Sequence, residues 1–151
     1  MKATDLLKKQ HREVKALFKK VEKTDNGRQR RQLLDEIATA LQGHTTIEEE
    51  MFYPAVRGLE TQKAEEMVLE SLEEHHVVAL VLAELPGVDV EDERFEAKMT
   101  VLSELVEHHA DEEEKAMFKL AATLGKEELE SLGEQMEARF EALAGRTRRA
   151  A

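Results

Sequence analysis

The stretch HTTIEEEMFYP, residues 44 to 54, returns later in the chain as HADEEEKAMFK, residues 109 to 119. In each copy a histidine is followed four residues later by a glutamate, and then by large apolar side chains. Residues four apart are neighbours on one face of an α-helix, so the two side chains of such a pair can converge on one point. The stretch therefore indicates two helices, each carrying a convergent His–Glu pair.

The repeat extends to the segments around two further histidines. HREVKALF, which begins at His11, resembles HHVVALVL, which begins at His75. His11 and His75 are 64 residues apart, and His44 and His109 are 65 apart. Self-similarity at a fixed period is the signature of a repeated structural unit. We interpret the chain as two similar helix pairs arranged with pseudo-twofold symmetry around a central site.

Apolar residues recur at spacings of three and four through most of the chain, which predicts amphipathic helices. The abundance of Ala, Leu, Glu and Lys, with only two prolines and seven glycines, favours an all-α chain. Short connections favour antiparallel neighbours, so we predict an up-down-up-down four-helix bundle with an additional C-terminal helix packed on its outside. We expect helices over about residues 4–23, 28–56 (bent or ended near Pro54), 61–85, 91–124 and 126–144. Residues 1–124 would form the bundle, and residues 125–151 an accessory helix and basic tail of the same domain.

Composition excludes several classes of protein. The chain has no cysteine, so a metal would need histidine and carboxylate ligands. The formal net charge of −11 disfavours nucleic acid as a partner. No apolar run is long enough for a membrane span, and no signal segment is evident, so we expect no membrane association and a cytoplasmic location. The terminal GRTRRAA is interpreted as a frayed basic tail.

The His–Glu pairs lie on apolar helix faces. His44 and Glu48 share a row with Ile37, Leu41 and Phe52, and His109 and Glu113 occupy the matching row of the later helix. A buried, unpaired carboxylate is costly, and a bound cation removes that cost, so the placement predicts a metal site. Four further acids lie off these rows and are expected to be solvated, as is the neighbouring His108: Glu49, Glu50, Glu112 and Glu114.

The remaining histidines give one clear candidate and one choice. The apolar neighbours of His11, among them Leu7 and Val14, place it inward. On the third expected helix either His75 or His76 could face the centre, and the match with the His11 segment favours His75. A single inward histidine is commonly a satisfied core residue. Four of them, one per helix, with two buried glutamates, indicate a metal centre.

Four imidazoles and two carboxylates exceed the ligands of one closed zinc site. They suit two ions that share the carboxylates, which helical bundles are known to hold. Imidazole and carboxylate ligands fit iron, manganese or zinc. Six protein ligands leave positions on two ions where water, dioxygen, peroxide or nitric oxide could bind.

Over about residues 3 to 123 the sequence resembles the hemerythrin-like, or HHE cation-binding, domains of bacterial type. The segments that carry the resemblance are LLKKQHREVKALF, HTTIEEEMFYP, EEHHVVALVLAEL and EHHADEEEKAMF. The resemblance implies a non-haem di-iron centre bridged by Glu48 and Glu113. It implies that the ligands are His11, His44, Glu48, His75, His109 and Glu113.

The chain also departs from the oxygen-carrying hemerythrins. Those have a histidine where this chain has Ala79, or Leu80 if His76 is the ligand. They also have an aspartate five residues after the last histidine, whereas Glu113 follows His109 by four. One iron would therefore have one imidazole fewer, with solvent or another acid in its place, which disfavours simple reversible oxygen carriage. Tyr53, the only tyrosine, is interpreted as a packing residue rather than a ligand.

Three hypotheses follow. The first is a di-iron protein that binds dioxygen or a related small molecule, such as peroxide or nitric oxide, for sensing, storage or protection. The second is an enzyme, namely a di-iron peroxidase, a catalase-like protein or a nitric oxide scavenger. The third is a helical interaction module in which the metal is structural.

Overall fold

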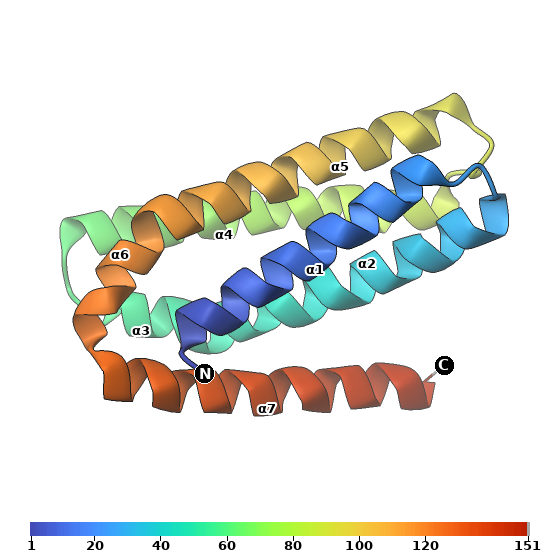
Figure 1. The fold of residues 1–151 in the computed structure, drawn as a ribbon. Helices are drawn as coiled ribbons and strands as arrows, with labels where there is room; N and C mark the ends of the chain where they lie inside the picture. Colours follow the sequence, from blue (N-terminus) through green and yellow to red (C-terminus); the bar gives the residue numbers. More distant parts are fainter. Residues whose placement is uncertain (151) are drawn as a thin grey trace.

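The computed structural model describes residues 1–150, which form helices joined by short connections and contain no β-strand (Figure 1). The α-helices are α1 (Ala3–Lys23), α2 (Gly27–Ile47), α3 (Tyr53–Arg57), α4 (Gln62–Glu84), α5 (Glu93–Glu112), α6 (Phe118–Ala121) and α7 (Lys126–Ala150). A π-helical turn, Glu48–Phe52, joins α2 to α3, and a second, Glu113–Met117, joins α5 to α6. The predicted all-α bundle with an extra C-terminal helix is confirmed.

Figure 1 shows α1, α2, α4 and α5 running alternately up and down the bundle, with α7 lying along the outside of α1 and α2. A polar N-cap residue precedes each of α2, α4 and α5. The side chains of Asn26, Thr61 and Asp92 each accept a hydrogen bond from a backbone N–H of the helix that follows. Gly125 ends the last bundle segment with φ 94°, a conformation that glycine adopts without steric cost. These sequence-local signals place the helix ends close to the predicted positions.

The prediction missed the two π-helical turns. In the first turn the Tyr53 N–H donates to the Glu48 carbonyl oxygen, five residues back, and in the second the Phe118 N–H donates to the Glu113 carbonyl oxygen. The helix does not end at Pro54, because Pro54 occupies the first turn of α3, where its missing N–H is tolerated. Such turns often occur at functional sites. Here each begins at a candidate ligand.

Helix α7 extends to Ala150, beyond the predicted end at residue 144, and Ala151 lies outside the described residues. Its apolar face packs on the bundle through Leu129 and Met136, both buried. The Phe140 ring lies so close to Gly43 that a Cβ at Gly43 would be 2.7 Å from it. Helix α7 thus packs directly behind His44, the next residue of α2.

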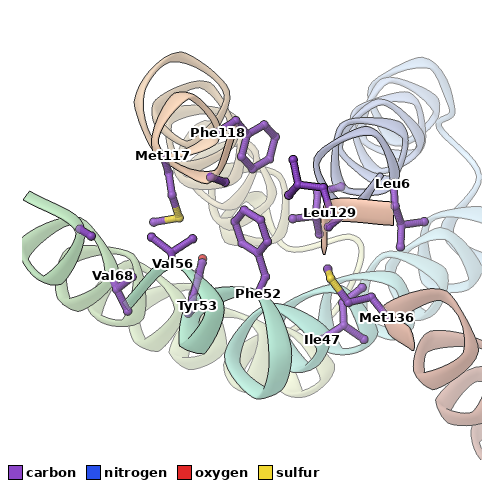
Figure 2. Close-up of a cluster of buried hydrophobic side chains, with 14 residues drawn as sticks. Leu6, Ile47, Phe52, Tyr53, Val56, Val68, Met117, Phe118, Leu129 and Met136 are labelled. Carbon is purple, nitrogen blue, oxygen red and sulfur yellow. The ribbon is translucent and has the colours of Figure 1, made fainter. Parts of the chain in front are cut away.

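The apolar core consists of two clusters. One lies at the end of the bundle formed by α3 and α6, where Phe52 and Phe118 meet edge to face with ring centroids 5.6 Å apart (Figure 2). The other lies toward the α1–α2 connection and contains Phe18, Leu34 and Phe95. Along each bundle helix, the candidate ligands lie between residues of the first cluster and residues of the second. The polar site is therefore a layer between two apolar ones.

Candidate metal centre

All six predicted site residues come together in this polar layer. Helices α1 and α4 place His11 and His75 there, and each π-helical turn adds a glutamate one helical turn after the histidine that precedes it. Glu48 is 0% exposed and Glu113 1%, so both carboxylates are removed from water. His75 is buried, whereas His76 is exposed, and this geometry selects His75 for the layer. His108 is exposed, as expected.

The six residues form two groups that share a carboxylate. The first group contains His11, His44, Glu48 and Glu113, and the second contains Glu48, His75 and His109. In the first group, Nε2 of His44 lies 3.1 Å from Oε1 of Glu48, and Nε2 of His11 lies 3.2 Å from Oε1 of Glu113. In the second, Nε2 of His75 lies 3.2 Å from Oε1 of Glu48. Oε1 of Glu113 also lies 3.3 Å from Nε2 of His109, so Glu113 reaches both groups.

These short distances are not ordinary hydrogen bonds. Nε2 of His11 and of His44, both carboxylate oxygens of Glu48 and Oε1 of Glu113 have no partner with hydrogen-bond geometry, although all are buried. The atoms are close to one another but point at a common space. Unpaired buried polar atoms are rare in proteins and require an explanation. A cation in the common space supplies one, because it would accept lone pairs from all of them.

The separations also fit metal coordination. Nitrogen and carboxylate ligands lie about 2.1 Å from a zinc ion, and two ligands at right angles around such an ion are about 3 Å apart. The nitrogen–oxygen separations in both groups are 3.1 to 3.3 Å. The two Nε2 atoms of His75 and His109 are 3.1 Å apart, and a lone pair on each would repel the other without a proton or a cation between them. The residues present therefore fit a bound metal.

Each candidate histidine is held at its other nitrogen, Nδ1. The acceptors are Glu114 for His11 (2.9 Å), Gln10 for His44 (2.7 Å), Glu49 for His75 (2.9 Å) and Glu74 for His109 (2.8 Å). An Nδ1–H that donates to an oxygen leaves the Nε2 lone pair for a metal and fixes the ring orientation. Glu49 and Glu114 keep solvated surface, as expected, with side chains 46% and 32% exposed, but each also accepts a hydrogen bond from a histidine, which the prediction missed. Each lies beside a buried glutamate in sequence, and the helix turns it toward a histidine of the other half.

Gln10 and Glu74 were missed by the sequence analysis. Each immediately precedes an inward histidine, His11 or His75, and each pairs with a histidine on the adjacent helix of the same half. Gln10 and Glu74 occupy equivalent positions in the two halves of the repeat, and this equivalence could have identified them from the sequence.

Tyr53 packs in the apolar core, as predicted, and its hydroxyl also reaches the site. Its hydroxyl donates to Oε2 of Glu113 at 2.7 Å and lies 3.1 Å from Nε2 of His75 and 3.3 Å from Nε2 of His109. The side chain is 1% exposed, and it packs in the apolar cluster that Figure 2 shows. The π-helical turn explains this additional contact. It brings Tyr53 above Glu48, whereas an unbroken α-helix would turn this residue further from the site.

The electrostatics of the metal-free site favour charged pairs. Burial lowers the pKa of His109, but the carboxylates of Glu113, Glu74 and Glu48 outweigh burial and raise it to about 11. The same balance raises the pKa of His11 and of His75. Burial raises the pKa of Glu48, but the surrounding histidines and Glu113 outweigh it and hold the pKa well below its usual range. A cation would replace protons on the histidines without loss of the charge balance.

A small cavity lies against the four candidate histidines, between the layer and the second apolar cluster. Its volume is about 20 Å³, and its other walls include Val14, Leu41, Val78 and Val106. That volume is close to the size of one water molecule. The cavity can therefore hold a molecule of very few atoms next to the site, in mostly apolar surroundings.

The fold and the site define a helical bundle that brings buried histidines and glutamates together as candidate cation ligands. Residues 2–121 match the family described as Hemerythrin HHE cation binding domain. The chain belongs to this family. Among residues 1–150, no helix is long and apolar enough to cross a membrane.

Relatives in mycobacteria match nearly the whole chain. Uncharacterized protein Rv2633c of Mycobacterium tuberculosis is 34% identical over 148 residues, which is 96% of this chain and 89% of the relative. Uncharacterized protein Mb2666c of Mycobacterium bovis has the same identity and coverage. The crystal structure of a hemerythrin HHE cation binding domain-containing protein from Mycobacterium kansasii, an Rv2633c homolog, superimposes with a TM-score of 0.85 at 30% identity. The match covers 96% of this chain and 88% of that one.

Proposed function

We propose that this chain holds two non-haem iron ions and binds dioxygen or a related small molecule, namely peroxide or nitric oxide, for sensing, storage or protection. The observation that carries the proposal is the pair of ligand groups that share Glu48, with buried nitrogen and oxygen atoms that lack hydrogen-bond partners. His11 and His44 would hold one ion, and His75 and His109 the other. Glu48 and Glu113 would bridge the two, since each reaches histidines of both groups.

Iron is favoured over other metals by the family resemblance, and the donor set is compatible with it. Imidazole and carboxylate ligands suit iron, and manganese and zinc accept the same ligand types. The Nδ1 acceptors Glu49, Glu74 and Glu114 would increase the electron donation of three of the four imidazoles. Electron-rich ligands stabilise higher oxidation states, which suits an ion that changes its redox state.

The size and lining of the cavity support a very small ligand. A volume of about 20 Å³ beside the four histidines is close to that of one water molecule, so it suits a diatomic molecule or peroxide better than an organic substrate. Ferrous iron with open coordination positions supplies the chemistry, since it binds and reduces such molecules. The protein would orient the ligand between the histidine rings and exclude bulk water with Val14, Leu41 and Val78.

A second candidate function is enzymatic turnover of peroxide, and Tyr53 favours it. Its hydroxyl is a buried proton donor within 3.1 Å of a candidate ligand nitrogen. Burial, and then the charges of Glu48 and Glu113, raise the pKa of Tyr53 well above its usual value, so the metal-free protein keeps the phenol protonated. Tyr53 packs in the first apolar cluster and does not line the small cavity, so its proton would serve an oxygen species bound on the opposite side of the layer, which a simple carrier does not require.

The test is reconstitution of the metal-free protein with ferrous iron under anaerobic conditions, followed by metal analysis and a spectrum recorded on admitting air. About two irons per chain and a new near-ultraviolet absorption on oxidation support the di-iron proposal. Less than one iron per chain, with no spectral change, overturns it. Manganese and zinc added in competition would identify the preferred metal. Steady oxygen release or substrate oxidation with added hydrogen peroxide would select the enzyme over the carrier.

A further inference from the structure

A second hollow lies on the surface of the bundle, directly over the small cavity. It is a groove of about 290 Å³ between α2 and α4, open to solvent. Its outer part is lined by Ala38, Ala79 and Ala83, whose methyl side chains leave the space between the two helices unfilled. Ala79 lies one helical turn beyond His75, and both Ala79 and Ala83 are exposed.

The groove and the cavity are separated by a single layer of side chains. Leu41, Thr45, His75 and Val78 line both of them. Thr45 is only partly buried, and its hydroxyl donates to the backbone carbonyl of Gln42, so it is not fixed by a contact across the groove. Leu41, by contrast, is 5% exposed. A change of rotamer at Thr45, of the kind that exposed side chains make in nanoseconds, or a slower one at the buried Leu41, would join the two spaces.

The chemistry of the groove selects the molecules that can pass. Gln42 and Thr45 are its polar side chains apart from His75, and none of its lining residues is acidic or basic beyond that histidine. By contrast, the small hollow between α4 and α5 that reaches Glu113 is lined by Glu70, Glu74 and Glu112. That acidic route would repel anions and attract cations. The α2–α4 groove suits a small neutral molecule.

We propose that the α2–α4 groove is the access route by which a small neutral molecule reaches the metal centre, with Thr45 and Leu41 as the gate. This inference rests on the proposed function, because it requires a ligand at the metal. It makes Ala79 and Ala83 determinants of the access rate, although neither touches a candidate metal ligand's coordinating atom.

The test measures the association rate of nitric oxide with ferrous-loaded protein by anaerobic stopped-flow absorption. Ala79→Phe fills the groove next to His75, and Ala83→Phe repeats the block one turn further along α4. Ala144→Phe is the matched control, since it fills a hollow of similar size, about 260 Å³, between α2 and α7 that contains none of the six candidate ligands. Thr45→Ala widens the gate. Iron content and melting temperature are measured for every variant.

We expect Ala79→Phe to slow association about tenfold, a barrier raised by about 1.4 kcal/mol, with equilibrium iron content unchanged. Ala83→Phe should slow it less, Thr45→Ala should accelerate it, and Ala144→Phe should leave it unchanged. Equal rates in wild type, Ala79→Phe and Ala83→Phe overturn the access route. Equal slowing by the groove variants and by Ala144→Phe also overturns it. Wild-type protein that retains its iron but gives no optical change with nitric oxide overturns the proposed function instead.

Discussion

The two halves of the metal centre are built from equivalent residues but are not chemically identical. His11 corresponds to His75 and His44 to His109 in the repeat, and the Nδ1 acceptors Glu114 and Glu49 also correspond. Two positions differ. Gln10 holds His44, whereas its counterpart Glu74 holds His109.

The second difference is the aromatic side chain beside each group. Phe118 stacks on His11 with ring planes 3° apart, whereas its counterpart Tyr53 lies beside His75 and adds a hydroxyl to the second group. A duplicated scaffold has thus produced one group with an amide and a phenyl ring, and another with a carboxylate and a phenol. The second group has two anionic Nδ1 acceptors against one in the first, and it also has a hydroxyl. Two ions bound here would differ in affinity and in redox behaviour, and four experiments bear on that difference.

The largest effect is expected from Glu48→Ala, because Glu48 belongs to both groups. We expect reconstituted iron to fall from about two ions per chain to near none, since each ion loses a ligand and the charge that balances it. Metal analysis after desalting measures the result. His76→Ala, an exposed histidine next to His75, is the control and should retain full iron. Retention of iron by Glu48→Ala would show that the groups do not depend on a shared carboxylate.

The next largest effect concerns pH in the metal-free protein. The folded pKa values of His11, His75 and His109 are raised, so their contribution to stability is complete below the unfolded histidine value near 6.5. It is lost as pH rises through the folded values, which for His109 is about 11. Urea unfolding of the metal-free protein should therefore show falling stability from pH 7 to about 9.

We expect His109→Gln to remove much of this pH dependence, because His109 faces both Glu74 and Glu113. Metal affinity should change in the opposite direction and rise with pH, since binding must displace protons from Nε2. A pH-independent unfolding free energy would contradict the charged pairs in the metal-free site.

A third experiment exchanges the Nδ1 acceptors. Glu74→Gln should weaken one of the two ions about 10-fold to 100-fold, the usual effect of an outer partner of a metal-bound histidine, and make the halves alike. Gln10→Glu should instead tighten the other ion. Competition against a chelator with known affinity gives both binding steps. If the variants change the two steps equally, the acceptors do not distinguish the ions.

The smallest effect is expected from the aromatic pair. Tyr53→Phe loses the hydrogen bond to Glu113 and should destabilise the metal-free protein by about 1–3 kcal/mol in urea unfolding, while iron content stays near that of wild type. Any turnover of peroxide should fall as well, because the proton donor is gone. The double variant Tyr53→Phe with Phe118→Tyr moves the hydroxyl to the first group. Unchanged peroxide kinetics in Tyr53→Phe would remove the proton-donor role.

Much of the site could be predicted because the repeat is written in the sequence. Equivalent spacing of four histidines and two glutamates, on apolar faces, identified all six residues that meet in the polar layer. Helical periodicity and the caps at Thr61 and Gly125 fixed the fold class and most helix ends. Both kinds of signal are local, because they depend on neighbours within one or two helical turns.

Other features depended on contacts between helices that are distant in the sequence. Glu49 and Glu114 lie on the border between the buried and the solvated face, and only the neighbouring helix decides that each meets a histidine. The π-helical turns carry no clear sequence signal, yet they rotate Tyr53 and Phe118 toward the layer. The α2–α4 groove exists because Ala79, where the oxygen carriers have a histidine, faces α2 across an unfilled space.

The sequence by itself determined that four helices bring histidine and carboxylate side chains to one buried level. This could be predicted because the spacing of residues within a single helix shows that a charged side chain lies on an otherwise apolar face. Only the tertiary structure decided which atoms share a space, which histidine each acceptor holds, and where a small molecule can enter. These features depend on how the helices cross and on the extra residue in each π-helical turn, which rotates the side chains that follow it. They also depend on the space that side chains leave unfilled between helices.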